Sequence, residues 1–77
     1  MPHVTVKMYR GRTEDDKARL AAEITKAVKT ALGSGDEAIS VGIEDIEPAD
    51  WAETVYRPDI LNKPGSIYKK PGYDPFR

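Results

Sequence analysis

The chain contains no cysteine and a single histidine, His3, among its 77 residues. These absences exclude a disulfide framework and a thiolate metal site, and a zinc site built on histidines is not expected. Acidic and basic residues are mixed along the chain, with a formal net charge of -1, so the clustered positive charge typical of nucleic-acid binding is missing. No apolar run approaches the roughly 20 residues of a membrane-spanning helix, and no signal-peptide pattern is present. We expect a cytoplasmic protein without metal, organic cofactor, nucleic-acid partner or membrane association.

Residues 1–46 carry the pattern of a β-α-β unit. Apolar and polar side chains alternate over residues 3–9, which is typical of a half-buried strand. Thr13 is a suitable helix N-cap, apolar residues then recur at helical spacing, and Gly33 is suited to end the helix. A second alternation over residues 39–43 predicts another strand. Strand, long helix and strand in this order predict an α/β fold with parallel strands and a right-handed crossover.

Residues 47–77 differ in composition. They hold five of the six prolines and five of the six aromatic residues. Prolines exclude a long helix or a central strand here, whereas a disordered tail would be poor in aromatics. We expect a short helix over residues 48–56, with Pro48 in its first turn, followed by an ordered, irregular arm. The whole chain, residues 1–77, is predicted to form a single domain.

Two strands and one helix do not form a stable sheet on their own. Parallel strands normally have both faces covered, and the helix covers only one. The other face, which carries Thr5, Lys7, Ser40 and Gly42, needs a cover from the aromatic arm or from a second subunit. A chain of this length also buries only about 60–65% of its unfolded surface. We therefore expect a symmetric oligomer.

Pro2, directly after Met1, is the residue whose chemical state matters most for the function of this chain. With Met1 in place, the ring nitrogen of Pro2 belongs to an amide and has no available lone pair. Removal of Met1, which is common when the next residue is small, would turn this nitrogen into a secondary amine and therefore a base. Pro2 could also simply begin an edge strand, a place where proline is tolerated.

Pro2, a strand, the pair Gly11 and Arg12, a long helix and a second strand together resemble the 4-oxalocrotonate tautomerase family. The small subunits of this family use an amino-terminal proline as a catalytic base. The resemblance covers residues 2–51. Three further motifs are similar to the PptA-like branch, whose members are dimers, whereas the shortest family members form hexamers. These motifs are Met1-Pro2-His3, Pro48 with Trp51, and Tyr68-Lys69-Lys70-Pro71-Gly72-Tyr73.

The resemblance implies roles for three residues. Pro2 is the base, Arg12 contacts a substrate carboxylate, and Trp51 packs over the substrate. A second arginine, which the hexameric members carry in the second strand, falls on Ser40. Because Ser40 carries no charge, dicarboxylate substrates are in doubt. Three other cations could take the place of this arginine: Lys7, Arg10 and Arg57.

The implied chemistry is keto–enol tautomerisation of a small 2-oxo acid, such as an aryl pyruvate or a 2-hydroxydienoate, by a homodimeric isomerase. This reaction needs a base whose pKa lies near the working pH. A free α-amine has an ordinary pKa of about 7.7–8.0. Apolar surroundings and nearby cations disfavour its protonated form, so Trp51, Arg10 and Arg12 are expected to lower the pKa of Pro2 and to leave it largely unprotonated at neutral pH.

Simpler roles remain open for the same residues. Arg12 could be a solvated turn arginine near the acids of the helix start, and Trp51 could anchor the arm. His3 flanks the base but is expected to point to the opposite face, because strand neighbours alternate.

Two other functions also remain open. The same scaffold could add water to a small unsaturated acid, as a hydratase or dehalogenase, with Pro2 protonated and with Asp50 or Glu53 activating the water. A non-catalytic oligomeric interaction module, with Met1 retained, is the other possibility.

Overall fold

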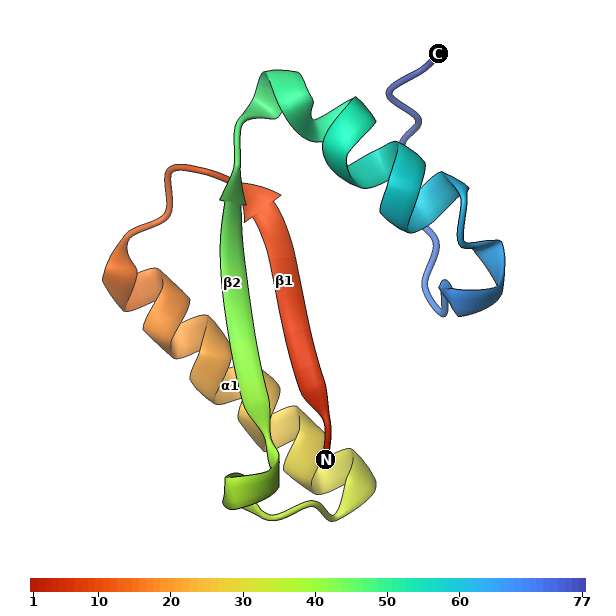
Figure 1. Ribbon diagram of the computed structural model, residues 1–77. Coiled ribbons are helices and arrows are strands. Elements are labelled where there is room, and N and C mark those ends of the chain that lie inside the picture. Colours follow the sequence, from red (N-terminus) through yellow and green to blue (C-terminus); the bar gives the residue numbers. More distant parts are fainter.

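A computed structural model describes residues 1–77. Its main elements are β1 (His3–Tyr9), α1 (Glu14–Leu32) and β2 (Ser40–Ile46), as seen in Figure 1. The two strands pair in parallel, with His3 opposite Ser40 and Tyr9 opposite Ile46. This arrangement confirms the predicted β-α-β unit, because parallel strands require the crossover that α1 provides.

Local signals fix both ends of α1. The Thr13 hydroxyl accepts a hydrogen bond from the backbone N–H of Asp16 at 3.0 Å, and acidic residues fill the first turn, where they complement the helix dipole. At the other end Gly33 adopts a left-handed conformation with φ 73°, and its N–H donates to the carbonyl of Lys29 at 2.9 Å. Glycine adopts this conformation without a Cβ clash.

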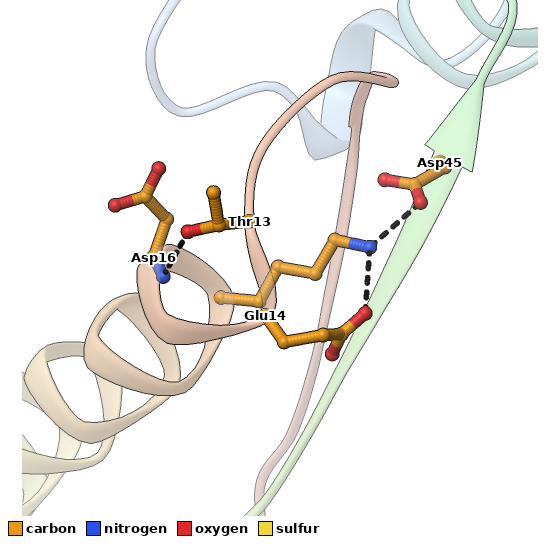
Figure 2. A network of polar contacts seen from close by, with 5 residues as sticks. Thr13, Glu14, Asp16 and Asp45 are labelled. Carbon is orange, nitrogen blue, oxygen red and sulfur yellow. Dashed lines mark hydrogen bonds and ion pairs between the residues drawn. The ribbon is translucent and has the colours of Figure 1, made fainter.

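An ion-pair network ties the start of α1 to the end of β2 (Figure 2). The Lys17 ammonium lies 2.6 Å from Asp45 on β2 and 3.6 Å from Glu14. The hydrogen bond from Asp45 raises the pKa of Lys17 above its ordinary value. This contact holds the start of α1 against the carboxyl end of β2.

The α1 helix covers one face of the two-stranded sheet (Figure 1). None of the apolar side chains of the two strands and of α1 is buried, since most are half-buried and some, such as Leu32, are exposed. The two buried residues of the chain, Val55 and Tyr56, lie in the C-terminal segment. The β-α-β unit therefore has no fully buried core within a single chain.

The dimensions of the chain agree with an incompletely covered sheet. Its accessible surface is 5891 Å², whereas a compact monomer of this mass exposes about 4,700 Å². Its radius of gyration is 14.0 Å, against roughly 11.5 Å for a compact domain of this length. None of the helices combines the length and the apolar composition needed to cross a bilayer.

The C-terminal segment contains more helix than the sequence predicted. Three elements follow β2: η2 (Pro48–Asp50), the π-helix η3 (Ala52–Leu61) and η4 (Pro64–Ser66). Helical structure therefore continues five residues beyond the predicted end at residue 56, with Pro58 inside it. A proline ring clashes with the carbonyl four residues before it in an α-helix. The wider turn of η3, in which Asn62 N–H donates to the carbonyl of Arg57 at 3.0 Å, accommodates this ring.

The aromatic arm folds back onto η3 instead of lying over the open face of the sheet. The Tyr56 ring packs against Tyr73 and Phe76, with centroid distances of 5.6 and 5.7 Å. The Arg57 guanidinium lies 4.4 Å from the centre of the Phe76 ring, a cation–π contact. The arm is therefore ordered, as expected, by contacts with its own segment.

Candidate active site

Pro2 lies at the amino end of β1 and extends the ladder by one residue. Its carbonyl accepts a hydrogen bond from the backbone N–H of Ser40 at 3.2 Å, and Pro2 is half-buried. Met1, in contrast, is fully exposed, at 103% of its reference surface. A peptidase could therefore reach the Met1–Pro2 bond while Pro2 stays anchored to β2.

Arg12 follows β1 in the loop that leads to α1. The preceding Gly11 has a φ of 122°, a conformation that other residues rarely adopt, and this turn carries Arg12 away from the strand. Arg12 is exposed and forms no ion pair within the chain. It lines a hollow of about 440 Å³, which we call the arginine hollow. Its lining residues are Met8, Arg12, Asp16, Arg19, Leu20 and Glu23.

Trp51 lies at the other side of the sheet, in a second hollow of about 550 Å³ between the open face and η3. Its ring packs edge-on against Tyr9, with centroids 5.3 Å apart, and its indole N–H donates to the Tyr73 hydroxyl at 2.8 Å. The same residue therefore anchors the C-terminal arm and lines a hollow. The second hollow also contains Lys7, whose ammonium bonds to Asp59 at 2.5 Å.

The structure does not bring Pro2, Arg12 and Trp51 together within one chain. Pro2 precedes β1, whereas Arg12 and Trp51 follow the carboxyl ends of the two strands. A seven-residue strand spans about 23 Å, far beyond the reach of direct contact. Arg12 and Trp51 also line separate hollows. The expected cluster around Pro2 is thus absent from the single chain.

The three cations considered as replacements for the second arginine all have carboxylate partners. Lys7 bonds to Asp59, Arg10 bonds to Glu47 at 2.6 Å, and Arg57 bonds to Glu53 at 2.8 Å. The hydrogen bond from Asp59 raises the pKa of Lys7, and the bond from Glu53 raises the pKa of Arg57. These cations are therefore already engaged in internal contacts.

The Arg57 pair also bears on Glu53, one of the two carboxylates considered for water activation. The hydrogen bonds that Arg57 donates, at 2.8 and 3.1 Å, lower the pKa of Glu53 below its ordinary value. A carboxylate with a lowered pKa is a weaker base.

Ser40 makes a small polar network with His3 on the open face of the sheet. One ring nitrogen of His3 lies 2.6 Å from the Ser40 hydroxyl, and the other lies 3.2 Å from the Thr5 hydroxyl. Ser40 thus binds a neighbouring side chain and carries no charge toward a substrate.

Sequence reasoning missed Arg19, which shares the arginine hollow with Arg12. The signal was present in the helical spacing: Asp16, Arg19, Leu20 and Glu23 stand at positions i, i+3, i+4 and i+7, which lie on one helix face. The loop before α1 places Arg12 beside the first turn of that face.

A parallel β-α-β chain with a proline just before its first strand and an exposed arginine in the loop after that strand has the arrangement expected of a small tautomerase-type protein. The family model described as "Tautomerase enzyme" matches residues 2–55, and the chain belongs to this family. Membership supports an activity of the tautomerase type and confirms the resemblance found in the sequence.

Relatives of known name agree with this assignment over nearly the whole chain. A probable tautomerase of Xylella fastidiosa is 38% identical over 73 residues, which cover 95% of this chain and 89% of that protein. Tautomerase PptA of Pectobacterium carotovorum is 36% identical over 74 residues, which cover 95% and 97% of the two chains. The likeness to the PptA-like branch therefore includes the C-terminal arm.

Solved structures share a smaller part of the chain. The structure of YwhB, a homologue of 4-oxalocrotonate tautomerase, has a TM-score of 0.58 and 46% identity, covering 60% of this chain and 75% of that one. A structure from a study of trans-3-chloroacrylic acid dehalogenase activity has a TM-score of 0.61 and 26% identity, covering 64% and 92%. The β-α-β fold is thus that of the 4-oxalocrotonate tautomerase family.

Proposed function

We propose that this protein is a cytoplasmic keto–enol tautomerase that acts on a small 2-oxo acid, with Pro2 as general base once Met1 has been removed. The observation that carries this proposal is that the family match begins at Pro2 itself, behind a fully exposed Met1. Loss of Met1 creates the secondary amine on a residue that its bond to Ser40 already holds in place.

The proposed reaction moves one proton from the enol oxygen of the substrate to one of its carbon atoms, with Pro2 as the carrier. The lone pair of the Pro2 amine accepts the proton of the enol hydroxyl, and the resulting ammonium donates it to the carbon two atoms away. Arg12 binds the substrate carboxylate through two parallel hydrogen bonds, a geometry for which a guanidinium is suited. Its positive charge also stabilises the enolate that forms between the two proton transfers.

We further propose that the site forms between two chains of a homodimer. The outer edge of β1 is unpaired within the chain, and an open strand edge is a template for pairing with another copy. A two-fold axis through this edge would set the two β1 strands antiparallel. The amino end of one strand then lies beside the carboxyl end of the other, so Pro2 of one chain approaches Arg12 of its partner.

The dimer also supplies the cationic surroundings that the base requires. Within one chain, Arg10, Arg12 and Trp51 lie at the far end of the sheet from Pro2, so they cannot lower its pKa. In the antiparallel dimer these groups of the partner chain lie at the same end as Pro2. The likeness to the dehalogenase structure keeps a water-adding reaction as the second candidate, although the engagement of Glu53 by Arg57 argues against that carboxylate as its base.

The mass of the protein isolated from its native host tests the first requirement of the proposal. We expect the mass of a chain without Met1 and with an unmodified amine. A Pro2→Leu variant is the matched control, because a large second residue should leave Met1 in place. A native protein that retains Met1 would contradict the tautomerase proposal and favour a non-catalytic module.

A further inference from the structure

The amino end of β1 is held to β2 by contacts from one residue, Ser40. Its backbone N–H donates to the Pro2 carbonyl at 3.2 Å, and its hydroxyl lies 2.6 Å from Nδ1 of His3. Ser40 is also the residue that faces His3 in the register of the two strands. A single residue of β2 therefore contacts both of the first two residues that remain once Met1 is lost.

The imidazole of His3 is oriented by further contacts on the open face of the sheet. Its Nε2 lies 3.2 Å from the hydroxyl of Thr5, which is two residues along the same face of β1. A neutral imidazole has one donor and one acceptor nitrogen, and a hydroxyl can donate or accept, so both contacts can be satisfied together. The ring also lies against β2, because its Cε1 is 3.9 Å from where a Cβ at Gly42 would stand. His3 thus keeps a defined orientation although it is exposed.

Pro2 has few contacts of its own that would keep it in place. Proline has no backbone N–H to donate, and a chain terminus is poorly ordered unless it is tied down. The carbonyl of Pro2 accepts the bond from Ser40, at the very end of the ladder. The side-chain bond of the next residue, His3, therefore restrains the strand end that carries the proposed base.

We infer that His3 is a positioning residue, which holds the nitrogen of Pro2 in its reactive orientation through the bond to Ser40. This inference rests on the proposed function. Neighbouring side chains of a strand point to opposite faces, so His3 acts through the backbone of β1 and not on the substrate. Loss of the bond should therefore lower kcat and leave KM unchanged, because the carboxylate of the substrate is bound by Arg12.

Four variants of the assembled protein without Met1 test this role, with a 2-hydroxydienoate as substrate and the loss of enol absorbance as the measured rate. His3→Leu and Ser40→Ala each remove the bond, and each should lower kcat about 3- to 10-fold, the change that one hydrogen bond supports. KM should change less than about twofold. His3→Asn should recover most of the rate, because its amide carries donor and acceptor atoms as far from the backbone as Nδ1. His3→Gln places these atoms nearer to the position of Nε2 and should recover less.

A double variant and a control distinguish the bond from a general effect on the chain. The protein with both His3→Leu and Ser40→Ala should be no slower than either single variant, because both changes remove the same bond. Ser66→Ala removes a hydroxyl from the exposed η4 and should keep the wild-type kcat. Circular dichroism and size-exclusion chromatography should show that the fold and the assembly of every variant are unchanged.

The outcomes separate this inference from the proposed function. The role of His3 would be overturned by a wild-type kcat in His3→Leu, by an effect confined to KM, or by equal rates in His3→Asn and a slowed His3→Leu. Losses that add in the double variant, or that accompany loss of the fold or the dimer, would overturn it as well. In each of these cases the wild-type protein still converts the enol. A wild-type protein that does not convert the enol would contradict the proposed function itself, and this inference with it.

Discussion

Replacing Pro2 with alanine should lower kcat for enol-to-keto conversion by about 100-fold or more. A positioned general base typically accelerates a reaction about 10²- to 10⁴-fold. The lower end of this range applies here, because the variant without Met1 still has a primary amine at its amino terminus. That amine lacks the ring that fixes the nitrogen relative to β1. Loss of enol absorbance in a stopped-flow or conventional spectrometer measures the rate, on protein whose mass shows that Met1 has been removed.

The matched control is Pro48→Ala, which removes a proline ring from the exposed start of η2. This variant should keep the wild-type rate, since Pro48 lies in neither hollow. Circular dichroism and size-exclusion chromatography of both variants establish that fold and assembly are intact. Unchanged turnover in a folded, assembled Pro2→Ala protein would remove Pro2 from the mechanism.

Mixing two inactive variants should restore activity if each site uses two chains. Pro2→Ala removes the base from one chain, and Arg12→Ala removes the carboxylate ligand, at a cost of about 10- to 100-fold in kcat/KM. After the mixture is unfolded and refolded, half of the dimers are hybrids. Each hybrid carries one intact site and one doubly defective site, so total activity should reach about a quarter of the wild-type value.

The activity expected of the mixture distinguishes a site shared between two chains from a site made within one chain. A site made within one chain would give a mixture whose activity is only the average of the two variants, because every chain would contain one defect. A protein that remains monomeric at the assay concentration would also contradict the proposal. Each variant alone, unfolded and refolded in the same way, controls for losses of activity during refolding.

The β-α-β unit could be predicted because its signals are local. Strand alternation, the Thr13 cap and Gly33 each act within a few residues, and the structure places the strands and α1 within one to three residues of the predicted bounds. The longer helix of the C-terminal segment could not be predicted in this way. Whether a helix ends at Pro58 depends on the type of helix that surrounds it, and π-helices are rare in proteins.

Candidate residues of the site could be named from residue type, whereas their separation within the chain could not be foreseen. Pro2 and Arg12 could be named from a proline after methionine and an arginine after a strand. Their separation by the length of β1 follows from the fold, and the proposed pairing with another chain would bring them together. Arg19 was missed because a charged residue on an amphipathic helix is usually a solvated one, and its hollow forms only when the loop after β1 folds against α1.

The single chain gives a physical reason to expect that assembly and chemistry are linked. Only Val55 and Tyr56 are buried, and both belong to the segment that packs against its own arm. Pairing through β1 would cover apolar surface of the β-α-β unit and complete the site in one step. Stability and activity should therefore depend together on protein concentration.

The most direct measurement is an NMR titration of the Pro2 amine in the processed, assembled protein, with nitrogen-15 in the proline ring. In the proposed dimer a guanidinium and an indole of the partner chain would disfavour the protonated amine, so we expect its pKa to lie below the ordinary value of about 7.7–8.0 for an α-amine. The rate constant kcat/KM should rise with pH through the same value, because only the unprotonated amine can accept a proton. An amine that stays cationic well above neutral pH while the enzyme is active would contradict the account.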